Sequence, residues 1–223
     1  MTKIHPDSSE LAKQLRLPHG EFAQQVGEFM ERNNREMYSL CIRHASIMDD
    51  DCILEIGPGN GGLVSMFYAA NNSIRYTGIE MSPEMIHSCQ LKNEREIEKG
   101  RARFIHGSIL GLEEDDSLFD QIFGINVIYF LEPLEEYLTK LNSLLKSGGK
   151  LVLGYRQKES MLKLPFIDSG FTLFSDSEIE HFLIKSGFSG IHFFHAEEEI
   201  RLLQGGTAVL SYTTCLASKA KMT

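Results

Sequence analysis

Short runs of β-branched, aromatic and aliphatic residues alternate along the chain with segments whose apolar residues recur at helical spacing. This alternation is typical of βαβ units, in which helices join parallel strands. The runs that predict strands are CILEI (52–56), IRYTGIE (74–80), ARFIH (102–106), QIFGINV (121–127), KLVLGY (150–155), IHFFHA (191–196) and TAVLSYTTCLA (207–217). We therefore expect an α/β fold with a seven-stranded, mostly parallel sheet and helices on both of its faces.

Helix boundary signals lie between these runs. Ser82 is followed by proline and predicts the start of a helix that runs to Gly100. Ser175 and Glu178 form a capping-box pattern at the start of the last helix. A further helix is predicted over 133–149, where it meets a pair of glycines.

The two ends of the chain differ from this alternating pattern. Residues 197–206 contain no long helical segment, so we expect the last two strands to form an antiparallel hairpin. Apolar residues at helical spacing over 8–17 and 20–47 predict helices that cover the sheet or form a lid. Because no linker or internal repeat divides the sequence, we predict one domain, 1–223, with a helical extension (1–48) and a core (49–223).

The most informative stretch is ILEIGPGNGG, residues 53–62. A strand that leads through a glycine-rich turn into a helix places backbone amides at the carboxyl end of a parallel sheet, where such folds bind ligands. Gly57, Gly59 and Gly62 also satisfy the G-x-G-x-x-G pattern of dinucleotide sites, which alone is weakly specific. The turn therefore predicts a nucleotide-like ligand, but it does not indicate which class of nucleotide-like ligand binds.

Two glutamates lie near this turn. Glu55 is inside an otherwise apolar strand, where an unpaired carboxylate would cost several kcal/mol, so it needs a partner. Loop backbone amides or a cationic group of the ligand are the two partners we consider. Glu80 ends the second strand, where a carboxylate can accept hydrogen bonds from both hydroxyls of a ribose; a solvated strand end is the alternative.

From residue 51 to residue 219 the chain resembles the class I, Rossmann-like S-adenosylmethionine-dependent methyltransferases. The segments that carry the resemblance are LEIGPGNG (54–61), GIEMSPEMI (78–86), FIHGSI (104–109), FDQIFGINVIYFLEP (119–133) and LLKSGGKLVL (144–153). Five motifs in order and at the spacing of the family are far more specific than any one of them. The family's reversed final strand also agrees with the hairpin predicted above.

The resemblance implies S-adenosylmethionine as cofactor, with S-adenosylhomocysteine as product, and a set of binding residues. The methionine part would be held by Gly57, Pro58, Gly59 and Asn60, with Glu55 near its amino group, Glu80 on the ribose and Met81 on the adenine face. Ser108 and Ile109 fall where the family contacts the adenine edge, although the family commonly has an acidic residue in place of Ser108. Asn126 would line the methionine side of the pocket and face the transferred methyl group.

Considered on its own, Asn126 is a polar residue at the end of an apolar run, and either lines a pocket or caps the strand. Tyr129 follows closely and is our candidate for a substrate neighbour, with core packing as the alternative. Methyl transfer from a sulfonium is an in-line displacement that positioning and desolvation can catalyse. We therefore assign no catalytic base, and the sequence identifies no catalytic residue.

Charge, apolar run length and cysteine spacing limit the kinds of partner that we expect for this protein. The net charge of −9 argues against a nucleic-acid surface, and the longest apolar run, 122–131, is about half the ~20 residues of a transmembrane helix. The four scattered cysteines form no metal-ligand pattern, so we predict no metal. The N-terminus lacks a secretory signal pattern, so we expect a cytoplasmic protein, as a monomer or a homodimer, with no nucleic-acid or membrane partner.

These observations predict a methyltransferase that acts on a small molecule, recognised by the N-terminal helices and the insert 157–174. Two other hypotheses stay open. A nicotinamide-dependent oxidoreductase would use the same glycine turn, and a non-catalytic cofactor-binding protein would keep the same fold.

Overall fold

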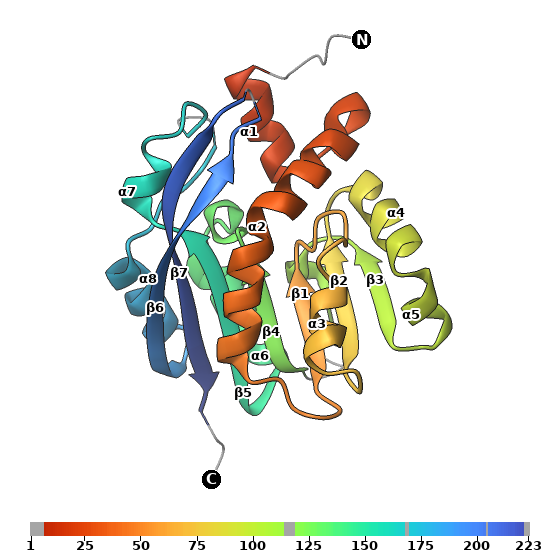
Figure 1. Ribbon diagram of the computed structural model, residues 1–223. Helices are drawn as coiled ribbons and strands as arrows, with labels where there is room; N and C mark the ends of the chain where they lie inside the picture. The colour runs from red at the N-terminus through yellow and green to blue at the C-terminus, as the bar shows by residue number, and fades with distance from the viewer. Residues whose placement is uncertain (1–6, 114–118, 168–169, 204, 221–223) are drawn as a thin grey trace.

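The computed structural model describes residues 7–113, 119–167, 170–203 and 205–220, and within them the chain forms one seven-stranded sheet (Figure 1). The strand order is β3-β2-β1-β4-β5-β7-β6. Strands β1 to β5 are parallel, whereas β7 runs antiparallel to both β5 and β6. The strands are β1 (Cys52–Ile56), β2 (Arg75–Glu80), β3 (Ala102–His106), β4 (Phe119–Ile125), β5 (Leu145–Arg156), β6 (Phe188–Arg201) and β7 (Thr207–Lys219).

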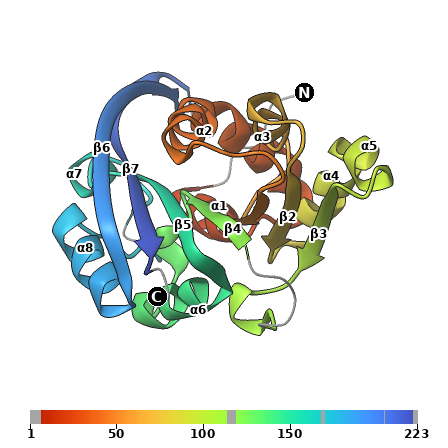
Figure 2. The same ribbon diagram turned by 90° about the horizontal axis from the view of Figure 1, so that it is seen from below.

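Helices cover both faces of the sheet, which makes three layers (Figure 2). The α-helices are α1 (Ser8–Arg16), α2 (Ala23–Ala45), α3 (Ser65–Ala70), α4 (Pro83–Lys92), α5 (Glu94–Glu98), α6 (Leu134–Leu144), α7 (Lys158–Met161) and α8 (Asp176–Lys185). Short 3-10 turns are η1 (Gly20–Phe22), η2 (Ile109–Gly111) and η4 (Ile128–Phe130). Apolar residues of α2 and α3 pack on one face, and those of α6 and α8 pack on the other.

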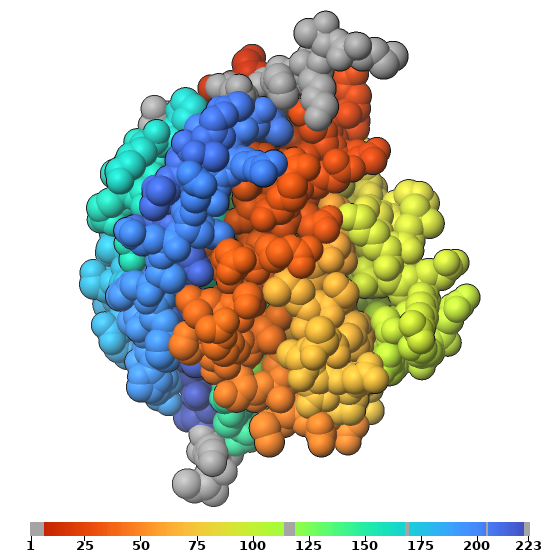
Figure 3. All heavy atoms as spheres, in the orientation of Figure 1, coloured from red at the N-terminus to blue at the C-terminus, as the bar shows by residue number. Residues whose placement is uncertain are grey.

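The long helix α2 is the main cover of its face. Met37 and Cys41 are fully buried against the sheet, and Gly154 of β5 leaves them room, because a Cβ there would lie 2.8 Å from Cys41 Sγ and 3.0 Å from Met37 Sδ. In the space-filling view this orange helix runs between the blue β6–β7 hairpin and the yellow helix α4 (Figure 3). The N-terminal helices are thus built into the sheet's packing, in agreement with a covering role.

The predicted fold class is confirmed, including the final antiparallel hairpin, but one helix boundary is wrong. The helix predicted over 133–149 ends at Leu144, and β5 begins at Leu145. Leu145 pairs with Phe119, after which the register shifts so that Lys150 pairs with Gln121. A Cβ on Gly149 would lie 3.1 Å from the carbonyl oxygen of Asp120, so the glycine permits a close approach of two backbones here rather than ending a helix.

Two further boundaries in the structure differ from those predicted from the sequence. The helix predicted to run from Ser82 to Gly100 is split into α4 and α5 at Asn93, whose side-chain amide donates to the carbonyl oxygens of Gly61 (3.1 Å) and Cys89 (2.9 Å). Strand β4 ends at Ile125 rather than at residue 127, because Asn126 has a φ of +57°, outside the strand region.

None of the helices in the described part of the chain is long and apolar enough to cross a bilayer. All four cysteines are free thiols, and Cys41, Cys89 and Cys215 are buried.

Candidate active site

The glycine-rich turn after β1 lies close to its neighbours, and its glycines leave room for them. Gly57 has a φ of +66°, and a Cβ there would lie 2.7 Å from Val127 Cγ1 in the loop after β4. A Cβ on Gly62 would lie 2.2 Å from the carboxyl group of Glu31 on α2. That carboxylate accepts from Asn60 Nδ2 (3.0 Å). The glycines therefore let the turn approach both the β4 loop and α2.

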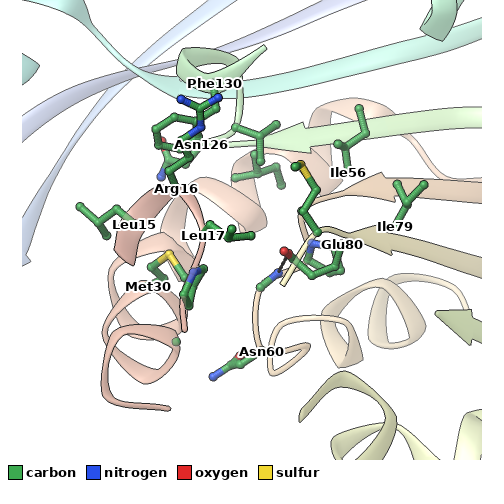
Figure 4. A pocket seen from close by; sticks show the side chains of 18 of the residues that line it. Leu15, Arg16, Leu17, Met30, Ile56, Asn60, Ile79, Glu80, Asn126 and Phe130 are labelled. Carbon is green, nitrogen blue, oxygen red and sulfur yellow. Dashed lines mark hydrogen bonds between the residues drawn. The ribbon is translucent and has the colours of Figure 1, made fainter. Parts of the chain in front are cut away.

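A cavity of about 350 Å³ opens beside this turn, at the carboxyl ends of β1, β2 and β4 (Figure 4). Strands β1 and β4 lie side by side although their crossovers run in opposite directions, which is where open α/β sheets bind ligands. Nine of the ten residues predicted to bind the cofactor line it: Gly57, Pro58, Gly59, Asn60, Glu80, Met81, Ser108, Ile109 and Asn126. The structure thus brings together residues that are up to about 70 positions apart in the chain.

Glu80 is held in place by backbone amides. One carboxylate oxygen accepts from the Gly59 N–H (3.2 Å) and the other from the Ser82 N–H (2.9 Å). The side chain is buried, and burial raises the pKa of this carboxyl above its ordinary value despite those two hydrogen bonds. Each oxygen still has a second lone pair, so the carboxylate can accept two further hydrogen bonds from the cavity.

The tenth predicted residue, Glu55, does not line the cavity. Its carboxylate is fully buried and accepts hydrogen bonds from the hydroxyls of Tyr38 and Tyr76, the latter at 2.5 Å. Its partners are therefore two tyrosine hydroxyls, which corrects the loop amides considered from the sequence, and the carboxylate does not reach the cavity where a cationic ligand group would lie. Burial raises the pKa of Glu55 to about 7, although both hydrogen bonds oppose this. Tyr38 itself lines the cavity, so its side chain lies between the Glu55 carboxyl group and the cavity.

Ser108, Ile109 and Met81 form the wall next to β2 and β3. The Ser108 hydroxyl accepts from the Leu110 N–H (3.3 Å) and so caps η2. Ile109 is buried, whereas Met81 is 56% exposed and leaves its thioether free to cover a flat group. The Met81 carbonyl oxygen lies 3.0 Å from His106 Nε2, which anchors this edge of the cavity.

Asn126 and Tyr129 lie where β4 ends. The Asn126 side-chain amide donates to Asn34 Oδ1 on α2 (2.7 Å), and the Tyr129 hydroxyl donates to Asn126 Oδ1 (3.2 Å). The Tyr129 oxygen in turn accepts from the Arg156 N–H (2.5 Å). A non-glycine residue with positive φ is strained, and such strain clusters at functional sites. Asn126 is thus fixed both by its backbone and by two side-chain partners.

A second cavity of about 160 Å³ adjoins this point. Tyr129 lines it together with the insert that follows β5 and with residues of the β6–β7 hairpin. Of the residues that the structure describes, five line both cavities: Leu15, Met30, Asn34, Asn126 and Phe130. Within the described part of the insert 157–174, which excludes residues 168–169, the lining residues are Met161, Leu164, Pro165, Phe166 and Phe171.

The N-terminal segment covers the first cavity, which the sequence suggested only as one of two alternatives. Leu15, Leu17 and His19 line it, as does Met30 on α2 (Figure 4). The Ser82 hydroxyl donates to the Pro18 carbonyl oxygen (2.6 Å), which ties the segment to the end of β2. The sequence of this segment shows only a helical periodicity, so no single residue in it predicts the contact with the cavity.

Comparison with known proteins finds similarity to methyltransferases. Residues 54–151 match the model of a methyltransferase domain. The chain is 25% identical over 125 residues to erythromycin 3''-O-methyltransferase of Saccharopolyspora erythraea, which covers 56% of this chain and 41% of that protein. It is 30% identical over 113 residues to a Shewanella tRNA U34 carboxymethyltransferase, which covers 50% of this chain and 33% of that protein.

Among solved structures, a Haloferax volcanii protein in complex with the Trm112 methyltransferase activator superposes with a TM-score of 0.73. The two are 15% identical, and the match covers 91% of this chain and 96% of that one. Residues 54–151 therefore match a methyltransferase domain, and the fold is that of the class I, Rossmann-like methyltransferases, whose cofactor is S-adenosylmethionine. The stretches matched in the two curated relatives span less than half of each relative's length.

Proposed function

We propose that this protein transfers a methyl group from S-adenosylmethionine to a small-molecule acceptor. The observation that carries the proposal is the first cavity, where Gly57, Glu80 and Asn126 converge from three neighbouring strands inside a methyltransferase domain. A second, apolar cavity meets it at Asn126 and supplies room for an acceptor.

The cavity residues fit this cofactor. Glu80 presents two carboxylate oxygens, each with a lone pair left after its backbone hydrogen bond, and two ribose hydroxyls need two acceptors. The turn from Gly57 to Asn60 would hold the methionine part, and Met81, Ser108 and Ile109 would hold the adenine. Ser108 offers a hydroxyl where a carboxylate is common in the family, so its contact with an exocyclic amine lacks charge assistance.

When bound, S-adenosylmethionine would supply a methyl group on a sulfonium: a lone pair of the acceptor would bond to the methyl carbon while the C–S bond breaks and its electron pair stays with sulfur. The residues of the chain itself position the two reactants and remove water from around them. Asn34 and Asn126 hold the acceptor's polar group at the junction of the two cavities, and the segment from Leu15 to His19 excludes water from above. An acceptor that carries a proton on the reacting atom releases it to solvent.

Two observations favour a small molecule over a nucleic acid, although one relative is a tRNA enzyme by name. The net charge is −9, and a chain that neutralises phosphates needs the opposite excess. The second cavity is lined mostly by apolar side chains, as small-molecule sites are. The free thiols support a reducing, cytoplasmic location, and we propose that the chain acts there as a single domain, as a monomer or a homodimer.

The test is calorimetric titration of the protein with S-adenosylhomocysteine and, in parallel, with NADH. We expect micromolar binding of S-adenosylhomocysteine, about −8 kcal/mol, and none of NADH. Binding of NADH alone would support the oxidoreductase hypothesis instead. Radiolabelled methyl transfer to a panel of small molecules and to bulk tRNA then separates the acceptor classes, and S-adenosylhomocysteine binding without methylation of any acceptor would support the non-catalytic hypothesis.

A further inference from the structure

We infer that the acceptor is an uncharged molecule whose reacting polar group is carried on a flat apolar ring, with the ring in the second cavity and the polar group against the amides of Asn34 and Asn126. This inference rests on the proposed function and names the class of substrate for the same site. Position, size, charge and hydrogen-bonding capacity of the second cavity each contribute to it.

The position of the second cavity suits an acceptor. Residues of its wall that also belong to the wall of the cofactor cavity are Leu15, Met30, Asn34, Asn126 and Phe130. The two spaces therefore meet along α2 and the end of β4. Asn34 and Asn126 are the polar residues among the five, so the polar, reacting group of a molecule in the second cavity would lie against their two amides.

The size and lining of the cavity suit a ring. Its volume is about 160 Å³, and an apolar cavity of about 150 Å³ is large enough to bind benzene. Phe171 lies at the centre of an aromatic cluster, with ring centroids 4.9 Å from Phe130, 5.7 Å from Phe166 and 5.8 Å from Tyr129. Planar groups pack on such clusters by stacked or edge-to-face contacts at these same distances.

The cavity offers no free charge to a ligand. Among the described residues that line it, Arg156 is the only charged one. Arg156 is 5% exposed, lies 2.5 Å from Glu198 in an ion pair and donates to the Asn33 carbonyl oxygen (2.7 Å). Because its charge is already compensated, a carboxylate or an ammonium on the acceptor would lose its hydration without gaining a partner.

The polar groups at the junction are neutral amides. Asn126 donates to Asn34 Oδ1 and accepts from Tyr129, which leaves one N–H on Asn126 and the amide nitrogen of Asn34 for an acceptor. These donors suit a neutral oxygen or nitrogen that carries a lone pair, such as that of a phenol or an aniline. An uncharged ring with one such group satisfies all four properties of the cavity.

The experiment measures binding of two matched probes to the protein saturated with S-adenosylhomocysteine. The probes are 4-ethylphenol, which is neutral, and 4-hydroxybenzoate, which has the same ring and hydroxyl but carries a carboxylate in place of the ethyl group. We expect 4-ethylphenol to bind at least tenfold more tightly, by calorimetry or ligand-observed NMR. Equal or tighter binding of 4-hydroxybenzoate, or no binding of 4-ethylphenol, would overturn the inference.

Two variants locate the probe. Leu210→Trp fills the second cavity and should weaken 4-ethylphenol binding at least tenfold, whereas Val209→Trp, which adds the same side chain at a 60% exposed neighbour, should not. Phe171→Ala enlarges the cavity and should raise the affinity for 2-naphthol relative to 4-ethylphenol, which keeps the test decisive if Leu210→Trp does not fold. Probe binding that neither cavity variant alters would refute the assigned location.

Binding of S-adenosylhomocysteine separates this inference from the proposed function. The lining of the cofactor cavity includes neither Leu210 nor Phe171, so both variants should bind S-adenosylhomocysteine as the unaltered protein does. Loss of probe binding alone then concerns the second cavity. If the unaltered protein does not bind S-adenosylhomocysteine, the proposed function fails and the inference that rests on it fails with it.

Discussion

The buried carboxyl of Glu55 makes the stability of this protein depend on pH in a direction that can be worked out. Its pKa is raised from the ordinary 4.5 to about 7 by burial, so the folded state holds a proton that the unfolded state releases. The resulting stabilisation is complete below pH 4.5 and is lost as the pH rises through 7. At 1.36 kcal/mol per pH unit, the loss amounts to about 3 kcal/mol.

The perturbation is Glu55→Gln, whose amide has nearly the shape of the protonated glutamic acid and keeps an acceptor oxygen and a donor group but cannot ionise. The free energy of unfolding of both proteins is measured by urea denaturation from pH 4.5 to pH 8. We expect the stability of the unaltered protein relative to the variant to fall by about 3 kcal/mol over this range. His44, whose pKa burial lowers, contributes a slope of the opposite sign, but it is present in both proteins and cancels.

The control is Glu136→Gln, at an exposed position on α6. The free energy of unfolding of this variant should follow that of the unaltered protein at every pH. Parallel stability curves for the unaltered protein and Glu55→Gln would refute the assignment of a buried, proton-holding carboxyl between Tyr38 and Tyr76.

Three further substitutions test the cofactor cavity. Glu80→Ala should weaken S-adenosylhomocysteine binding about 10- to 100-fold in calorimetry, because charged hydrogen bonds are worth about 1.5–3 kcal/mol, and unchanged affinity would contradict the ribose role. Gly57→Ala should lower the free energy of unfolding by roughly 1–3 kcal/mol in urea denaturation, since a Cβ would lie 2.7 Å from Val127 Cγ1 at positive φ, and Val127→Ala should restore part of the loss. Ser108→Asp should tighten S-adenosylhomocysteine binding several-fold by adding charge to the adenine contact, and weaker binding by a folded variant would argue against that contact.

The parts of the fold and site that the sequence predicts well are those encoded locally. The glycine turn directly follows β1, and the Glu80 carboxylate lies one βαβ unit further along the chain. Gly57 and Glu80 could therefore be found by pattern alone. The capping box of α8 is also local, and the structure shows both of its hydrogen bonds, through Ser175 and Glu178.

What the sequence did not reveal depends on contacts between distant segments. The partners of Glu55 are hydroxyls 17 and 21 residues away, and Asn126 binds an amide 92 residues upstream. Neither Tyr38 nor Asn34 differs in pattern from other residues of an amphipathic helix. The end of α6 was misplaced for a similar reason, since Gly149 is required by the approach of the Asp120 backbone from β4 rather than by the helix itself.

The central claim is that the cavity at the ends of β1, β2 and β4 holds S-adenosylmethionine. A crystal structure with S-adenosylhomocysteine tests it most directly. We predict the ribose hydroxyls on the Glu80 carboxylate, the homocysteine part along Gly57 to Asn60 and the sulfur towards Asn126. A ligand bound elsewhere, or one whose ribose makes no contact with Glu80, would contradict the account.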